Sequence, residues 1–258
     1  MSFRCLNLLL LTLIAGEAAA QNVLRVCADP NNMPFSNRQG QGFENKLAEI
    51  VAANLGVKLQ YTWWSLRTSF VKDSIDEGRC DVLMGVPTAL AAITPTRPYY
   101  RSTYVFVSRR DRGLHLTSLD DPRLNNLRIG IQIVGDDYAP PAIALARRGI
   151  TANIIAFSLF GDQENAHGKI IKAVVRGDID TAIVWGPFAG YFAKLQNAPL
   201  DIRPVSPAIF LGIPFTYEIS IGVRKGNESL KAELDKALIS ESSTVEGMLS
   251  QYGVPQVH

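Results

Sequence analysis

The chain has 258 residues, of which 47% are hydrophobic and 19% are charged, and its formal net charge at pH 7 is +2. The hydrophobic content predicts a packed globular protein, and so small a charge argues against a protein that binds nucleic acid. The length suffices for one large α/β domain or for two lobes of about 100 residues each.

The N-terminus predicts an exported protein. Arg4 precedes the apolar run 6–15, which is too short to span a bilayer, and the alanines 18–20 are typical of a signal-peptidase site. We therefore expect residues 1–20 to be removed. Cys27 and Cys80 remain after cleavage, and an oxidising compartment favours a disulfide between them. The alternative is that both are small residues of the buried core.

A repeated order of elements predicts the fold class. Four times an amphipathic segment ends in a glycine and is followed by a short apolar run, with the glycines at positions 56, 78, 149 and 177. Glycine is favoured in the left-handed conformation that ends a helix, and an apolar run suits a strand covered on both faces. This pattern is typical of an α/β fold with parallel sheets.

Along the chain, two such series are expected, and they suggest two lobes. The charged cluster 109–112 and the prolines at 204, 207 and 214 are interpreted as crossings between the lobes. The first lobe is predicted to comprise residues 21–110 and 207–258, and the second residues 111–206. The expected strands are 24–29, 59–64, 81–86, 104–107, 127–131, 202–205 and 215–223, with helices at 44–55 and, capped by Asn227, within 227–252.

Unusual side chains follow several predicted strands, where open parallel sheets meet their ligands. A single tryptophan or loop residue at such a position is more often core or an ordinary turn, but the recurrence favours a binding cleft. The candidate cleft residues are Asp29, Asn31, Asn32, Met33, Phe35, Trp63, Trp64, Thr88, Tyr99, Tyr100, Arg101, Asp137 and Trp185.

Catalytic and metal-binding patterns are hard to find. His115, His167 and His258 do not stand at metal-ligand spacing from cysteine or carboxylate, and there is no nucleophile elbow, phosphate-binding loop or complete dinucleotide motif. We therefore expect a protein that is not an enzyme and holds neither cofactor nor metal. A further alternative is a periplasmic dehydratase. Such an enzyme would need an acid or a base in the cleft, and the only obvious suppliers are Asp29, Asp136 and Asp137.

The order of elements, the Pro-Tyr-Tyr corner at 98–100 and the two crossings resemble the bilobal type II solute-binding proteins that deliver polar amino acids to ABC transporters. That family holds the ligand carboxylate with an arginine, its ammonium with an aspartate and its carboxylate again at a Gly-Thr-Thr helix start. The matching positions here are Ala89, Trp185 and the acidic segment 135–137. The three departures argue against an amino-acid ligand.

A narrower resemblance rests on the segments VCADPNNMPFSN, GFENKLAE, YTWW, GRCDVLMGVPT and RPYYRSTYVFV. They are similar to the MxaJ and XoxJ accessory proteins of periplasmic quinoprotein methanol dehydrogenases. The resemblance implies a periplasmic protein beside a pyrroloquinoline-quinone (PQQ) dependent methanol or alcohol dehydrogenase, lanthanide-dependent in the XoxJ branch. The implied partner is this dehydrogenase, alone or with its cytochrome c.

Two functions therefore stand side by side. The first is a binding protein that holds part of a dehydrogenase in an aromatic interlobe cleft and assists its maturation or activation. The alternative is a receptor of an ABC transporter for a small ligand other than an amino acid, which closes by hinges near 108–112 and 206–215.

Overall fold

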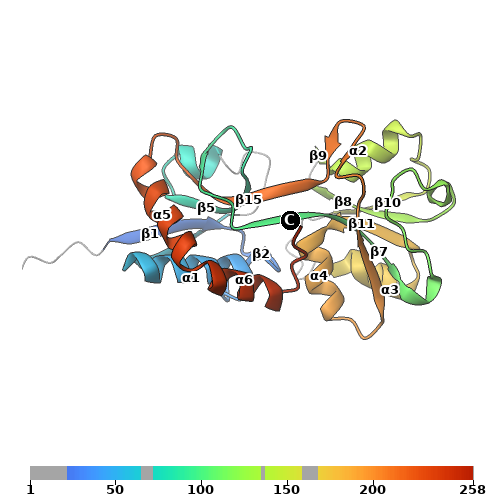
Figure 1. The fold of residues 1–258 in the computed structure, drawn as a ribbon, viewed down its shortest axis with the longest axis horizontal. Coiled ribbons are helices and arrows are strands. Elements are labelled where there is room, and N and C mark those ends of the chain that lie inside the picture. Colours follow the sequence, from blue (N-terminus) through green and yellow to red (C-terminus); the bar gives the residue numbers. More distant parts are fainter. Residues whose placement is uncertain (1–21, 65–71, 135–136, 159–167, 258) are drawn as a thin grey trace, which may run out of the picture.

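The computed structural model describes residues 22–64, 72–134, 137–158 and 168–257. The predicted export signal, Asp136, His167 and His258 lie outside these ranges. The described chain forms two α/β lobes joined by long strands, as Figure 1 shows. No helix among the described residues is long and apolar enough to cross a membrane.

The first lobe is built on three parallel strands, β1 (Val23–Ala28), β4 (Lys58–Trp63) and β5 (Val82–Pro87), with β15 (Thr216–Val223) antiparallel beside β5. Its helices are α1 (Phe43–Leu55), α5 (Glu228–Ser240) and α6 (Ser242–Gln251). Short elements complete it: β2 (Asn31–Asn32), β3 (Ser36–Asn37), β6 (Thr94–Pro95) and the π-helical turn Lys72–Asp76.

The second lobe repeats the plan with the parallel strands β10 (Ile154–Ser158), β8 (Ile129–Val134) and β11 (Thr181–Trp185). The strands β7 (Tyr100–Arg109) and β12 (Leu200–Pro204) continue this sheet in antiparallel pairing. The helices are α2 (Pro140–Arg147), α3 (Lys169–Arg176) and α4 (Gly186–Lys194). Short elements are β9 (Asp137–Tyr138), β13 (Ile209–Phe210), β14 (Ile213–Pro214) and the 3-10 turns Arg110–Arg112 and Pro122–Asn125.

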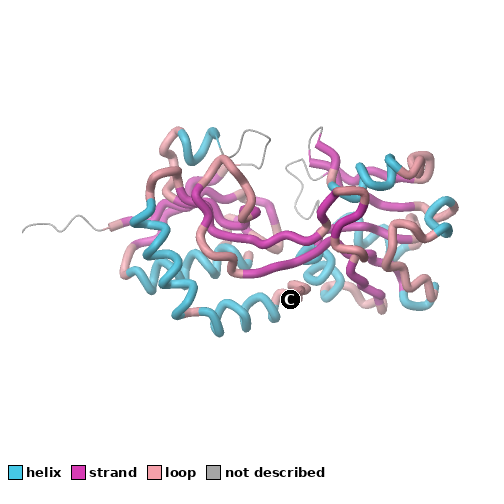
Figure 2. Tube along the Cα trace, turned by 45° about the horizontal axis from the view of Figure 1, so that its top comes forward, coloured by secondary structure: helices cyan, strands magenta, loops and turns pink. Residues whose placement is uncertain are grey.

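The two lobes share β7 and β15, which run across the waist of the molecule in Figure 2. Residues 100–103 of β7 pair with β15, whereas residues 104–108 pair with β11. The first crossing therefore falls between Thr103 and Tyr104, before the charged cluster 109–112, which forms a turn at the far end of β7. The proposed lobe boundaries at 110 and 207 stay a prediction.

The segment before β15 packs on the second lobe. Phe210, Ile213 and Phe215 are buried in the same apolar cluster as Leu116 and Ile129. The sequence assigns residues 207–215 to the first lobe, but their apolar side chains contribute to the core of the other. The chain thus returns to the first lobe only along β15.

The C-terminal tail forms a third connection. Ser102 on β7 donates a hydrogen bond of 2.5 Å to the carbonyl of Pro255, and the amide of Val257 donates to the carbonyl of Arg101. From the second lobe, Lys194 donates to two carbonyl oxygens in the last turn of α6. The tail therefore ties the end of α6 to both the crossing strand and α4.

One apolar cluster continues through both lobes on the helical side of the waist. Phe35 of the first lobe meets Phe188 of the second with ring centroids 5.0 Å apart, and both rings are buried. Packing of this kind resists separation of the lobes on that side. The cluster joins α1, α5 and α6 to α3 and α4.

Several local predictions are confirmed. Gly56 and Gly177 end α1 and α3 in the left-handed conformation, and Asn227 caps α5 by accepting a hydrogen bond from the amide of Leu230. Cys27 of β1 forms a disulfide with Cys80, which lies just before β5 in the first lobe. The bilobal α/β fold with two shared strands is the predicted class.

Candidate functional site

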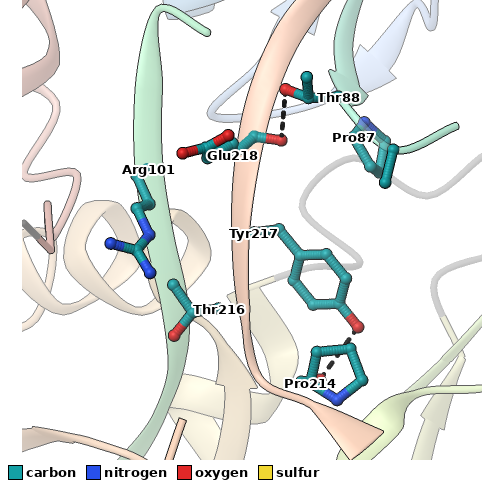
Figure 3. Close-up of a pocket in the computed structure, with 8 residues that line it drawn as sticks. Pro87, Thr88, Arg101, Pro214, Thr216, Tyr217 and Glu218 are labelled. Atoms are coloured by element: carbon teal, nitrogen blue, oxygen red, sulfur yellow. Dashed lines mark hydrogen bonds between the residues drawn. The ribbon is translucent and has the colours of Figure 1, made fainter. Parts of the chain in front are cut away.

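A groove of about 440 Å³ lies at the waist, on β15 and the end of β5. Figure 3 shows its polar and aromatic side chains around these strands. The groove is lined by Pro87, Thr88, Ala89, Arg101, Pro214, Thr216, Tyr217 and Glu218. Its volume falls within the range of sites for small ligands or for a short chain segment.

The position of Thr88 follows from the way β5 ends. Its amide and its hydroxyl both donate to the carbonyl of Glu218, at 2.9 and 3.1 Å, and its hydroxyl lies 2.7 Å from that of Ser220. These bonds attach the loop after β5 to the crossing strand β15. Thr88 is therefore held as a fixed part of the groove wall.

Arg101 and Glu218 are direct partners across β7 and β15. Both side chains are exposed, and neither makes a hydrogen bond or ion pair through its charged group with the other described residues. The groove therefore carries one available cation and one available anion. Opposite charges of this kind can orient a polar partner at the mouth of a groove.

Tyr217 brings an aromatic surface into the groove. Its hydroxyl donates to the carbonyl of Pro214 at 3.0 Å, as Figure 3 shows, and its ring centroid lies 5.8 Å from that of Trp185. Partial burial raises the pKa of Tyr217 above its usual value. The hydroxyl is therefore a neutral hydrogen-bonding group at physiological pH.

Trp185, a predicted cleft residue, is half-buried behind this tyrosine. Its ring makes an edge contact with Tyr104 at 5.4 Å, and Tyr104 in turn contacts Phe215. Burial is the main cause of the raised pKa of Tyr104, and the neighbouring Tyr217 is the second cause. Trp185 therefore supports the groove from behind rather than forming its lining.

A second group of predicted residues surrounds a buried carboxyl. Glu44, at the start of α1, is 8% exposed and accepts a hydrogen bond from the Tyr99 hydroxyl at 3.3 Å. Burial raises the pKa of Glu44 to about 8, although the Tyr99 bond lowers it in part. Burial also raises the pKa of Tyr99 and Tyr100, with the charge of Glu44 as a further cause. Sequence reasoning did not select Glu44.

Phe35 and Tyr100, two predicted cleft residues, are buried in the apolar core. Phe35 packs edge-on against Phe43 and Phe188, and Tyr100 packs against Phe43. Their large rings fill the junction between the lobes. Met33 is half-buried against the same core.

The paired tryptophans lie at the end of the edge strand β4 and are not among the residues that line the groove. Trp63 stacks on Tyr61 with centroids 4.7 Å apart, and the guanidinium of Arg38 lies over its ring. The guanidinium of Arg79 lies over Trp64 at 4.6 Å. Each ring is thus half-covered by its own lobe.

The polar loop residues form a turn. Asp29 accepts a hydrogen bond from the amide of Asn31, whereas Asn31 and Asn32 form the short strand β2. Asp137 lies in β9, and α2 begins after the N-cap position Ala139.

The site that the sequence predicted is thus divided in three. Thr88 and Arg101 line the groove. The candidates that pack on the core at the waist are Met33, Phe35, Tyr99, Tyr100 and Trp185. The other candidates lie in the turn 29–32, in β9 and at the β4 edge. The lining residues that were not among the predicted cleft residues are Pro87, Ala89, Pro214, Thr216, Tyr217 and Glu218. One feature of the sequence could have indicated the residues on β15, because a strand that crosses between two lobes must pass the cleft between them. Among the described residues there is no cluster of three or more side chains suited to a metal ion.

The comparisons with known proteins agree with the bilobal fold. Residues 24–253 match the model of the bacterial extracellular solute-binding proteins, family 3. The chain belongs to this family. The match covers both lobes and both shared strands.

Relatives within the family share nearly the whole chain. The protein MoxJ of Paracoccus denitrificans is 31% identical over 260 residues, which cover 94% of this chain and 92% of MoxJ. The crystal structure of the periplasmic binding protein XoxJ from Methylobacterium extorquens AM1 is 36% identical, with 91% of this chain and 99% of XoxJ covered and a TM-score of 0.74. That of MxaJ from Methlophaga aminisulfidivorans MPT is 27% identical, with coverages of 91% and 100% and a TM-score of 0.78.

Proposed function

We propose that this chain is a non-enzymatic periplasmic binding protein that associates with a PQQ-dependent methanol or alcohol dehydrogenase and assists its maturation or activation. The single observation that carries the proposal is the groove at the waist, which has an exposed Ala89 where an amino-acid receptor has its arginine. The similarity to MoxJ, XoxJ and MxaJ supports the choice of partner.

The groove is suited to a segment of polypeptide. Thr88, Thr216 and Tyr217 supply hydroxyl groups, two prolines supply apolar walls, and Arg101 and Glu218 supply one charge of each sign. A peptide offers its backbone amides to these hydroxyl groups, its charged side chains to the charge pair and its apolar side chains to the prolines. A loop or terminus of the dehydrogenase is therefore the proposed occupant, and its cytochrome c is expected only as a member of the larger assembly.

Native co-purification tests the association. The mature chain, expressed with an affinity tag in the periplasm of its native organism, should retain the PQQ dehydrogenase. Glu218→Lys should reduce the amount of dehydrogenase retained, because it reverses a charge at the groove. Glu246→Lys on the exposed face of α6 is the matched control. Absence of the dehydrogenase from every wild-type preparation, with or without PQQ in the medium, would sink the proposal.

A second candidate function is a receptor for a small solute other than an amino acid. The volume of the groove and its available charge pair, Arg101 and Glu218, favour it. A ligand at 100 times its dissociation constant stabilises a protein by about 2.7 kcal/mol. A thermal-shift panel of alcohols, amines, sugars and cofactor precursors distinguishes the two, since only the receptor should respond.

A further inference from the structure

The β13–β14 hairpin of the second lobe is apolar on both of its faces. Phe210 and Ile213 point inward and are buried, whereas Ile209 and Leu211 are 64% and 52% exposed. A surface hairpin ordinarily places polar side chains on its outer face. The buried pair is sufficient to anchor the hairpin, so the exposed pair is not required by the core.

The backbone of the hairpin loop makes the leucine more unusual. Leu211 and Gly212 both have positive φ angles, 51° and 75°, as in the two-residue turns that favour Asn-Gly. A leucine is unfavourable in the left-handed region, and here its exposed side chain gains little packing in return. The backbone conformation of the turn therefore disfavours a leucine at position 211.

The surroundings extend the apolar surface. Residues 204–217 contain no charged side chain, and Ile143 on the adjacent α2 is 41% exposed. Arg147 of the same helix donates a hydrogen bond of 2.7 Å to the carbonyl of Leu211 and makes no ion pair with the described residues. The Arg147 guanidinium thus lies beside a hairpin tip that has no charged side chain of its own.

The hairpin is also continuous with the groove. Pro214 is the cross-strand partner of Ile209, and Pro214 forms part of the groove wall. A protein that places a segment in the groove would therefore meet the hairpin next. The hairpin and the groove are therefore adjacent through Pro214.

We propose that the hairpin tip, formed by Ile209 and Leu211 with Ile143 beside it, inserts into an apolar depression on the partner protein whose rim offers a carboxylate to Arg147. This inference rests on the proposed function and names the dehydrogenase as that partner. A few side chains that fill a well-packed, desolvated pocket can carry most of the binding energy of an interface. A membrane surface would instead favour a broad apolar face with several cations and aromatic rings.

The test compares Leu211→Asn with Leu195→Asn in binding to the purified PQQ dehydrogenase. Leu195 is 61% exposed and ends α4, so it provides the same substitution outside the hairpin. Leu211→Asn should weaken binding by roughly tenfold or more, without lowering the thermal midpoint, because Asn-Gly suits this turn. Leu195→Asn should bind like the wild type. If Leu211→Asn lowers the midpoint, Ile209→Thr carries the same test with the turn unchanged.

The outcomes separate the hairpin from the proposed function. Wild-type binding with equal binding by Leu211→Asn, or by Ile209→Thr where that variant takes its place, would overturn the hairpin inference alone. No binding by the wild type would overturn both. Two further measurements complete the test: sedimentation detects a dimer of this chain, and flotation detects binding to anionic phospholipid vesicles. A dimer that Leu211→Asn abolishes would assign the tip to a second copy, and vesicle binding that it abolishes would assign the tip to a membrane. Either result would contradict the inference.

Discussion

The hydroxyl of Tyr99 donates a hydrogen bond to a carboxylate oxygen of Glu44 at 3.3 Å, between the corner before β7 and the first turn of α1. The carboxyl is buried beneath the waist, and its pKa is raised to about 8, mainly by loss of solvent. In the folded protein it is therefore largely protonated at pH 7. In the unfolded chain it is ionised above about 4.5.

This difference predicts that stability falls as the pH rises. The contribution of the neutral carboxyl is fully present below about pH 4.5 and is lost as the pH rises to about 8, with a slope of up to about 1.4 kcal/mol per pH unit. The facing hydroxyls of Tyr61, Tyr99 and Tyr100 have raised pKa values and stay neutral in this window. Urea unfolding between pH 5 and 8 should show the slope in the wild type and a flatter profile in Glu44→Gln. Equal slopes would contradict the assignment.

The C-terminal tail should depend on one glycine of the second lobe. A Cβ at Gly190 would lie 1.8 Å from the carbonyl oxygen of Gly253, so Gly190→Ala must displace the tail from α4. We expect a loss of about 1–3 kcal/mol. Gly247→Ala is the control, because its Cβ meets open space in α6 and should stabilise by about 0.5–1 kcal/mol. Denaturant unfolding that ranks the two variants alike would exclude this account of the tail.

The disulfide should contribute strongly to the stability of the first lobe. Cys27 and Cys80 are separated by 53 positions, and closing a loop of that size removes unfolded-state entropy worth about 4 kcal/mol. The double variant Cys27→Ala/Cys80→Ala should therefore unfold at lower denaturant concentration than the oxidised protein. Addition of dithiothreitol to the unfolding buffer should shift the wild type in the same direction and leave the double variant unchanged.

The tryptophan behind the groove should matter more for stability than the tryptophan at the sheet edge. Trp185 packs against Tyr104 and Tyr217, whereas the ring contact of Trp64 is with the Arg79 guanidinium. We expect Trp185→Ala to cost about 2–4 kcal/mol and Trp64→Ala under about 1 kcal/mol. Thermal unfolding of both variants provides the comparison, and a larger loss for Trp64→Ala would reverse the assignment.

The sequence predicted the architecture well because local signals agree with it. Gly56 and Gly177 mark helix ends, and apolar runs mark the buried strands. The lobe boundaries stay a prediction: the charges at 109–112 mark the end of β7, whereas the point at which β7 changes partners carries no local signal in the sequence.

The site was predicted only in part. Aromatic residues at strand ends have the same composition whether they line a cleft or fill a junction, and contacts such as Phe35 with Phe188 join positions far apart in the sequence. Thr88 and Arg101 are predicted residues that line the groove, whereas Glu218 was not predicted because only its cross-strand pairing with Arg101 places it there.

The most direct test of the central claim is an isothermal titration of the purified PQQ dehydrogenase with the mature chain and with the double variant Arg101→Gln/Glu218→Gln. Both changes are on exposed side chains, so stability should change by less than about 0.5 kcal/mol. The account predicts saturable binding by the wild type and at least roughly tenfold weaker binding by the double variant. No heat of binding by the wild type to either the PQQ-loaded or the PQQ-free dehydrogenase, or equal affinities for both proteins, would contradict it.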